Sequence, residues 1–544
     1  MKKIAILLIV LLTPVFFISN AQTITPRPKL VVGVVIDQMR YDYLYRFENL
    51  YGNDGFKKLM NEGSNFTFAH YNYVPTYTGP GHTSIYTGTT PYFHGIIAND
   101  FYDRQLKKVV YCTSDNSVST VGGTDKNGQE SPKRLLATTI TDQLKLATNG
   151  KSKVIAISIK DRASILPGGH MPDAAYWYDA ANGNFITSTF YMKKLPEWVN
   201  NFNDKKLAMK YMSMEWGLTY PPAKYVNTLP DKEPFEGDVF KEGKTVFPHS
   251  FKNLSEKQKL DEIRSTPYGN QILADFIEAA IKNENLGKGK NTDFLAVSFS
   301  STDYIGHDYG PNSVEVEDTY IKLDKNIAGL INELDKTVGK GNYVMFLTAD
   351  HAVADNPEYL EQRNVNAGRF SPSNVKKAVN EFCKETFGTD EIVENFSNKQ
   401  IFLNYNVLHN LKLDAFNVEH RIVQHLRHAF PEIAQMYTRA DLENWTAYRT
   451  SPNLILNGFN PALSGDIMIE LQPAYLFSGG KEATTHGSIY NYDTHVPLLF
   501  YGWHIPKQTI NKPVYTVDIA ATIADLLKIQ EPNACMGIPL IKGK

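Results

Sequence analysis

A run of apolar, mostly β-branched residues from Leu30 to Ile36 ends directly in Asp37. Uninterrupted apolar runs are typical of strands that are buried on both faces of a parallel sheet. Strand-like segments follow at residues 153–160, 293–299, 343–348 and 495–501, and helical patterns lie between several of them. We therefore predict an α/β fold: a mostly parallel central sheet with helices on both faces.

Two helical segments frame this alternation. A Ser-Pro start and an Asn-Gly end predict a helix over residues 131–149, and residues 517–529 are also predicted to be helical. A longer helix is indicated by apolar residues at alternating spacings of three and four, namely Val316, Tyr320, Leu323, Ile327, Leu330, Leu334 and Val338. Residues 170–290 and 355–480 break the pattern, so we expect insertions or a cap there within one catalytic domain over residues 22–544.

The N-terminal segment, the overall charge and the cysteine count indicate where the protein acts and which classes of partner it can bind. Residues 1–21 combine two lysines, an apolar run of about 15 residues and a small-residue end at Ala21. This pattern predicts a signal peptide cleaved after Ala21, hence a periplasmic or secreted protein without a stable membrane anchor. The formal charge of −2 excludes nucleic-acid binding through a broad basic surface. Three widely spaced cysteines allow at most one disulfide.

Acidic and histidine residues lie at four of the predicted strand ends, three sets after a strand and His486 just before the last one. In a parallel sheet, sites form at the carboxyl ends of strands, so we expect these side chains to meet. Six mixed oxygen and nitrogen ligands suit two zinc ions with about three protein ligands each, which can clamp both oxygens of an in-line displacement. An acid after a strand is also a frequent helix N-cap, so each residue alone is weak evidence. The six are Asp37, Asp303, His307, Asp350, His351 and His486.

A turn-rich segment around Thr78 provides a hydroxyl at the start of a predicted helix. Amide N–H groups and the helix dipole favour anions there, and a metal bound to the hydroxyl oxygen would lower its pKa. Thr78 is therefore a candidate nucleophile. The alternative is that the threonine is a helix N-cap.

Together these motifs resemble the alkaline phosphatase superfamily, most closely its PafA-type phosphate-monoester hydrolases. The resemblance rests on Asp37, the Pro-Thr-Tyr-Thr-Gly-Pro-Gly-His-Thr-Ser segment around Thr78, Ser-Thr-Asp-Tyr-Ile-Gly-His over 301–307, Ala-Asp-His over 349–351 and Thr-Thr-His over 484–486. It implies that Thr78 becomes a phosphothreonine. It also implies one zinc on Asp303, His307 and His486, and a second on Asp37, Asp350, His351 and the Thr78 oxygen.

Asn99, Lys160 and Arg162 complete the expected site. Alternation along an extended chain would place Lys160 and Arg162 on the same side, where both could bind phosphate oxygens together with Asn99. Without the resemblance, the two cations could equally be solvated charges at a strand end. The family usually has glycine where this chain has Ala352, which would be strained if the backbone there needs a positive φ.

We therefore predict a two-zinc alkaline phosphatase that hydrolyses small phosphate monoesters. The alternatives are a phosphodiesterase or phosphonate monoester hydrolase of the same superfamily and, more remotely, a non-catalytic metal-binding secreted protein. The sequence leaves open the physiological phosphate ester and the oligomeric state.

Overall fold

The computed structural model describes residues 27–123, 126–444, 453–480 and 482–542. The predicted signal peptide at 1–21 lies outside these ranges. Across the described residues, no helix combines the length and the apolar character that a membrane crossing requires. The three cysteines are unpaired.

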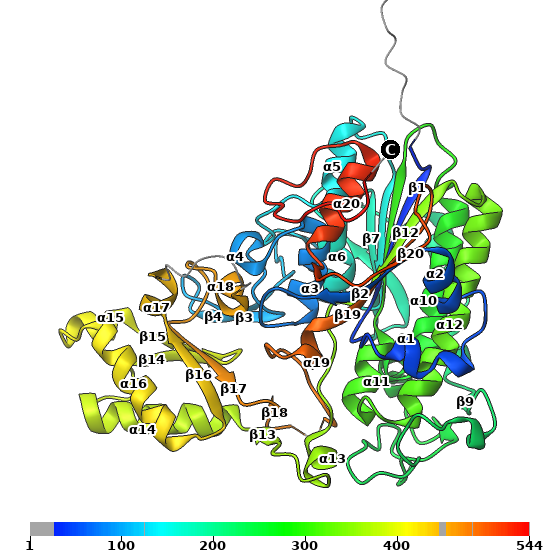
Figure 1. Cartoon of the computed structure of the whole chain (residues 1–544). Coiled ribbons are helices and arrows are strands. Elements are labelled where there is room, and N and C mark those ends of the chain that lie inside the picture. The colour runs from blue at the N-terminus through cyan, green and yellow to red at the C-terminus, as the bar shows by residue number, and fades with distance from the viewer. Residues whose placement is uncertain (1–26, 124–125, 445–452, 481, 543–544) are drawn as a thin grey trace, which may run out of the picture.

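Within the described residues, eleven strands form one sheet (Figure 1). The five at its centre are parallel to one another and run in the order β12-β1-β11-β6-β7. β19 and β8 lie antiparallel on either side of these five, β2 pairs antiparallel with β19, β5 pairs antiparallel with β8, and β20 and β21 pair parallel with β2. The strands are β1 (Leu30–Ile36), β2 (Ser64–His70), β5 (Thr120–Val121), β6 (Val154–Ser158), β7 (Ala174–Asp179), β8 (Asn184–Ser188), β11 (Asp293–Phe299), β12 (Tyr343–Thr348), β19 (His495–Gly502), β20 (Gln508–Ile510) and β21 (Val514–Tyr515).

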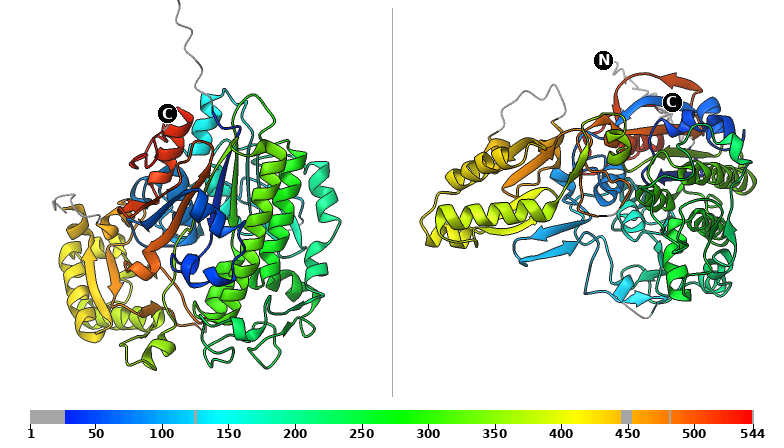
Figure 2. Two further views of the ribbon diagram at one scale, coloured as in Figure 1. Left: turned by 45° about the vertical axis from the view of Figure 1, so that its right-hand side comes forward. Right: turned by 90° about the horizontal axis from the view of Figure 1, so that it is seen from below.

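Helices cover both faces of the sheet, which confirms the predicted α/β architecture (Figure 1, Figure 2). Alternate side chains of β1 enter two separate cores, with Val32 and Val34 on one side and Val31 and Val35 on the other. The first core packs against α2 (Phe56–Glu62), α10 (Pro267–Asn283), α11 (Ser301–Tyr309) and α12 (Val314–Leu334), and the second against α3 (Thr78–Thr87), α5 (Ile140–Ala147), α6 (Arg162–Gly168) and α20 (Asp518–Leu527).

The predicted helix over 131–149 begins too early. It starts only at α5, where Thr139 is the N-cap and forms a capping box with Asp142. The Ser131 hydroxyl instead donates to Asp115 at 2.7 Å, so the apparent Ser-Pro cap belongs to a turn. A serine that looks like a helix N-cap in the sequence can instead bond a residue outside any helix, as Ser131 does with Asp115.

The two stretches predicted as insertions differ in the structure. Within the described part of residues 355–480, four antiparallel strands and three helices share a separate core and form a lobe (yellow and orange in Figure 1). The lobe comprises α14 (Pro372–Phe387), β14 (Val393–Ser397), β15 (Gln400–Leu403), α15 (Tyr405–Asn410), α16 (Ala415–Ala429), β16 (Ile433–Thr438) and β17 (Ile467–Leu471). Residues 170–290 are not a separate unit, because β7 and β8 extend the main sheet and α10 covers it.

Candidate active site

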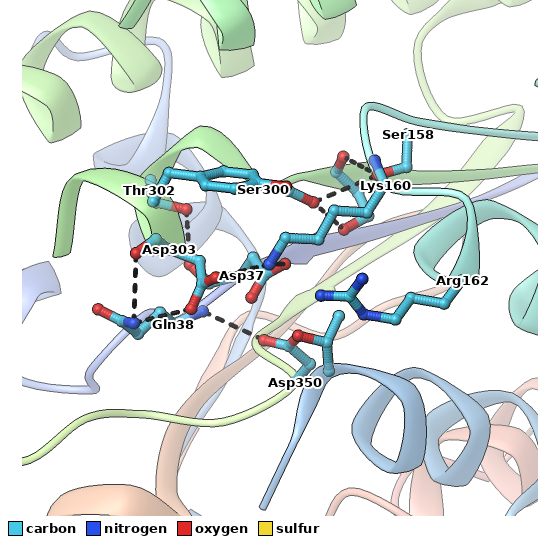
Figure 3. A network of polar contacts seen from close by, with 12 residues as sticks. Asp37, Gln38, Ser158, Lys160, Arg162, Ser300, Thr302, Asp303 and Asp350 are labelled. Atoms are coloured by element: carbon cyan, nitrogen blue, oxygen red, sulfur yellow. Dashed lines mark hydrogen bonds and ion pairs between the residues drawn. The ribbon is translucent and has the colours of Figure 1, made fainter. Parts of the chain in front are cut away.

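Three carboxylates meet where adjacent central strands end. Asp37 follows β1, Asp350 follows β12, and Asp303 lies in the first turn of α11, directly after β11. All three side chains are buried and point toward one another (Figure 3). The prediction that these strand ends converge is therefore confirmed by the geometry.

Each predicted histidine ligand is oriented by a backbone carbonyl. Nδ1 donates to Thr484 O at 2.8 Å in His307, to Ala352 O at 3.0 Å in His351, and to Thr76 O at 2.6 Å in His486. This leaves the three Nε2 atoms free to face the carboxylates. A hydrogen bond from the second ring nitrogen is the usual support of a metal-binding histidine.

The ligand atoms form two overlapping groups that could each hold a metal ion. One group is Asp303, His307 and His486, as predicted. The other combines Asp37, His351 and Asp303, rather than the predicted Asp350. The Asp350 carboxylate is nevertheless near, since Oδ2 lies 3.6 Å from His351 Nε2. Asp303 therefore lies between the two groups.

Buried side-chain atoms without a hydrogen-bond partner indicate whether a metal ion would fit in this cluster. Within the described residues, Asp37 Oδ1, Asp350 Oδ2 and His351 Nε2 are buried and lack a hydrogen bond, while Asp37 Oδ2 is paired with the Lys160 ammonium at 2.8 Å. Buried polar atoms are normally paired, and carboxylate oxygens with imidazole nitrogens are the donors that zinc takes. The residues present therefore fit two zinc ions.

The pKa values of the acids and histidines in this cluster are shifted by burial and by the charges of their neighbours. Burial and the neighbouring Asp37 raise the pKa of Asp350 well above its usual range. Burial would also raise the pKa of Asp303, but Lys160 and His307 hold it well below the usual range. Burial lowers the pKa of His351 to about 3, which keeps that imidazole neutral, as metal binding requires.

Thr78 is the first residue of α3. The N-cap position is held by Tyr77, which makes no side-chain cap, so the alternative that Thr78 is the N-cap is wrong. The helix approaches the metal-ligand cluster closely at Gly81, where a Cβ would lie 2.3 Å from the Asp350 carbonyl oxygen. The buried Thr78 hydroxyl is thus held at a helix start beside the Asp350 strand end.

Asn99 is joined to this helix start. Its Oδ1 accepts a hydrogen bond from the Gly79 amide at 2.7 Å. Because the carbonyl oxygen is used in this way, the side-chain NH₂ is left as a donor beside Thr78. This is the group that could bind an anionic oxygen.

Lys160 and Arg162 point toward the same carboxylates, but not for the predicted reason (Figure 3). The chain is already helical at Asp161, with φ −53° and ψ −54°, and Arg162 is the first residue of α6, so strand alternation does not apply. The solvated-charge alternative is wrong for Lys160, which is buried with Nζ 2.8 Å from Asp37 Oδ2 and 2.6 Å from Asp303 Oδ2. Arg162 Nη1 donates to the Tyr111 hydroxyl at 2.9 Å.

Two residues without a predicted role support the cluster. Gln38 has a φ of +63°. Its side-chain Nε2 donates to Asp303 Oδ1 at 2.7 Å, and its backbone N–H donates to Asp350 Oδ1 at 3.1 Å. His82 Nδ1 lies 2.9 Å from the Thr78 carbonyl oxygen and 3.3 Å from Asp350 Oδ2. The spacing of four residues between Thr78 and His82 was the available signal, because such residues share a helix face.

Ala352 is compatible with the site. Its φ is not positive, so alanine there carries none of the strain that a left-handed backbone would impose. Its amide donates to the Asp493 carbonyl at 2.8 Å. The departure from glycine is therefore conformationally neutral.

Comparison with known proteins gives matches over nearly the whole chain. The family described as type I phosphodiesterase / nucleotide pyrophosphatase matches residues 31–495. Alkaline phosphatase PafA of Elizabethkingia meningoseptica is 44% identical over 518 residues, which cover 95% of this chain and 94% of PafA. Alkaline phosphatase PhoV of Synechococcus elongatus is 44% identical over 520 residues, covering 94% and 92%. A Myroides odoratus protein named calcium-transporting ATPase is 45% identical over 523 residues, covering 94% of each chain.

The solved structures agree with this likeness. The crystal structure of PafA matches with a TM-score of 0.91 and 43% identity, covering 95% of this chain and 98% of PafA. A PafA variant substituted at a threonine, an asparagine, a lysine and an arginine matches over the same shares with a TM-score of 0.90 and 43% identity.

Proposed function

The chain belongs to the type I phosphodiesterase / nucleotide pyrophosphatase family, within the alkaline phosphatase superfamily, and from this premise we propose that it hydrolyses phosphate monoesters with Thr78 as nucleophile. It is an enzyme of the alkaline phosphatase type, as its likeness to PafA and PhoV over most of its length indicates. One observation carries the proposed chemistry: the Thr78 helix start lies beside a buried cluster of carboxylates and imidazoles that includes Asp350.

The metal assignment is part of this proposal. Asp303, His307 and His486 would hold one zinc, and Asp37, Asp350, His351 and the Thr78 oxygen the other. Bound zinc would supply Lewis acidity that lowers the pKa of the Thr78 hydroxyl and stabilises the leaving oxygen. The cluster around Asp303 and the free Nε2 atoms support this assignment.

The protein's own groups position the phosphate. Thr78 Oγ1 gives up its proton and bonds to phosphorus while the bond from phosphorus to the ester oxygen breaks, so the alcohol leaves carrying a proton. Water then cleaves the phosphothreonine, which releases inorganic phosphate and restores the Thr78 hydroxyl. The Asn99 side-chain NH₂, the Lys160 ammonium and the Arg162 guanidinium would bind the non-bridging oxygens. The solved PafA variant is substituted at a threonine, an asparagine, a lysine and an arginine, the same residue types as those proposed here. We also propose that residues 1–21 direct export of the enzyme.

Covalent phosphate on Thr78 tests this proposal. Zinc-loaded enzyme is mixed with an aryl phosphate, quenched in acid and analysed by intact-protein mass. Thr78→Ala should carry no covalent phosphate and lose at least about a thousandfold in turnover. Thr87→Ala is the matched control, because Thr87 is buried on the same helix and its hydroxyl bonds locally, donating to Thr83 O at 2.8 Å and accepting from the Thr89 amide at 3.4 Å. Full turnover by Thr78→Ala would sink the assignment.

The choice of ester is tested separately. A diester carries a second organic group where a monoester presents another oxygen to Lys160 and Arg162. We therefore expect a higher kcat/KM for an aryl phosphate than for the methyl aryl phosphate. The reverse preference would favour the phosphodiesterase alternative.

A further inference from the structure

A two-stranded hairpin connects the proposed phosphate-binding groups with the lobe. It consists of β3 (Asp100–Asp103) and β4 (Lys108–Tyr111), which pair antiparallel and lie beside the lobe (Figure 1). Asn99 directly precedes β3. Tyr111, whose hydroxyl accepts a hydrogen bond from Arg162, is the last residue of β4. One end of the hairpin therefore carries contacts to two groups of the proposed phosphate site.

One face of the hairpin packs toward the helix that carries Arg162. Successive side chains of a strand point to opposite faces, and directly paired residues share a face. Phe101 and Val110 are such a pair. Both enter a small buried core that includes Leu166 of α6, and α6 begins with Arg162. The hairpin is thus packed beside the backbone that positions the guanidinium.

The other face of β3 contacts the lobe. The Tyr102 ring meets the Phe402 ring edge to face, with the centroids 5.2 Å apart. Asn398, in the turn between β14 and β15, donates from its side-chain Nδ2 to Asp100 O at 2.6 Å. The lobe therefore bonds directly to the residue that follows Asn99.

Arg104 fastens the opposite end of the hairpin to the lobe. It follows β3, and its Nη2 donates to Asp466 Oδ2 at 2.6 Å while its Nη1 donates to Leu403 O at 3.2 Å. The guanidinium also lies over the Phe402 ring, 4.9 Å from the centroid. Hydrogen bonds between charged groups are stronger and more directional than neutral ones. The hairpin is accordingly held to the lobe at both of its ends.

The Asp466 carboxylate connects Arg104 to the framework of the lobe. Asp466 is fully buried, and its Oδ2 also accepts from the Leu403 amide at 2.7 Å. Its Oδ1 accepts from the Tyr405 hydroxyl at 2.8 Å and from Arg439 Nε at 2.9 Å. Because Arg439 would remain as a positive partner, loss of Arg104 should release the hairpin without leaving Asp466 as an unpaired buried charge.

A second contact fixes the lobe relative to the metal-ligand cluster. Lys399 is buried, pairs with Glu470 at 3.2 Å and donates from Nζ to Gly487 O at 2.9 Å. Gly487 directly follows His486, a proposed zinc ligand. The lobe is therefore held near one part of the site and can position the hairpin at another.

We propose that the lobe positions the phosphate-binding groups through this hairpin, with Arg104 and Asn398 as the positioning residues. The inference rests on the proposed function. Both residues would act through Asn99, which is to bind phosphate, and through Tyr111, which holds Arg162. A misplacement of about 1 Å in such groups can cost about a hundredfold in rate, so contacts distant from the phosphate can affect its binding.

Phosphate binding to the zinc-loaded enzyme tests this role without turnover. Isothermal titration calorimetry measures the Kd of inorganic phosphate, and elemental analysis measures the zinc content. We expect Arg104→Met and Asn398→Gly each to weaken phosphate binding about tenfold while the zinc content stays unchanged. Glycine is chosen at position 398 because the backbone there has a φ of +52°, which glycine adopts without strain.

Lys107→Met is the matched control on the same hairpin. Lys107 forms a largely exposed pair with Glu394 of the lobe at 3.6 Å. Exposed pairs contribute little, so this variant should bind phosphate within about twofold of the wild type.

A variant that lacks both routes to the phosphate separates positioning from a general loss of stability. Asn99→Ala combined with Tyr111→Phe removes the two groups through which the hairpin acts. Adding Arg104→Met to this double variant should therefore change the phosphate Kd by less than about twofold. A loss of stability alone would weaken binding by the same factor in both backgrounds.

Two results would overturn the inference. The first is either single variant, folded and with full zinc content, binding phosphate as tightly as the wild type; if Arg104→Met does not fold, Asn398→Gly decides. The second is a full tenfold loss from Arg104→Met in the double variant. Phosphothreonine formation by the wild-type enzyme is measured alongside. If it forms, the proposed function stands even when this inference fails, and if it does not form, both are wrong.

Discussion

Replacing Lys160 with methionine should make the enzyme bind zinc more tightly while it turns over more slowly. The Lys160 ammonium contacts both Asp37 and Asp303, in a site where a third carboxylate, Asp350, is also buried. Methionine keeps a similar length without the charge. When zinc is removed by a chelator, Asp37 in the variant is therefore left buried without the ammonium, and Asp303 keeps His307, 3.2 Å away, as its positive partner.

The size of the effect follows from a thermodynamic cycle. Removing one partner of a buried ion pair costs about 3–5 kcal/mol. With zinc bound, the ligand carboxylates have another positive partner, and we expect the loss of Lys160 to cost about 1 kcal/mol, as for a screened pair. The difference of about 2–4 kcal/mol appears as zinc affinity, and at 1.4 kcal/mol per tenfold it amounts to about 30- to 700-fold tighter binding.

Competition with a chromophoric chelator measures the zinc dissociation constants, and turnover of an aryl phosphate is followed in parallel. Lys153→Met is the matched control, because that lysine forms a partly exposed pair with Glu284 at 2.8 Å and should leave zinc affinity within about twofold. Zinc affinity that is unchanged or weaker in Lys160→Met would refute the reasoning.

Three further substitutions probe other contacts. Tyr111→Phe removes the 2.9 Å hydrogen bond that holds Arg162, so kcat/KM for a monoester should fall about tenfold at unchanged zinc content. Lys399→Met removes a donor to the carbonyl that follows His486, and elemental analysis after dialysis should show about tenfold weaker retention of one zinc. The pKa of His170 is raised by its hydrogen bond to an aspartate, so its stabilisation is complete below the unfolded pKa of 6.5 and is lost as pH rises through the folded pKa. Melting curves should accordingly show a Tm advantage over His170→Gln that is larger at pH 6 than at pH 8, and an advantage growing with pH would contradict this.

The sheet and the ligand cluster could be predicted because they depend on local, strong signals. A strand buried on both faces must be apolar throughout, as Leu30–Ile36 is. A charged residue directly after such a strand is then expected at the carboxyl edge of the sheet. Parallel neighbours end at one edge, which brings Asp37, Asp303 and Asp350 together. The carboxylate cluster could therefore be expected as soon as the three strands were taken to be parallel neighbours.

The supporting contacts could not be predicted, because they depend on backbone conformations and helix boundaries that the residue types do not indicate. Gln38 contacts two carboxylates from a backbone position with a positive φ, which residues other than glycine seldom adopt. Arg162 points inward because helix α6 begins there, whereas an extended chain would have been needed for the predicted alternation.

The place of β19 in the sheet sets the order in which the enzyme can be assembled. This strand, residues 495–502, inserts between β2 and β12, which are synthesised far earlier. Until it emerges, those two strands present unpaired edges, and His486, which precedes it, is not yet held. A chain that stops before β19 therefore leaves a gap in the middle of its sheet, and exposed edges of this kind are templates for aggregation. Binding of the proposed metal ions is accordingly expected only after this strand has been synthesised, and nearly complete fragments should be insoluble and unable to hold their full complement of metal.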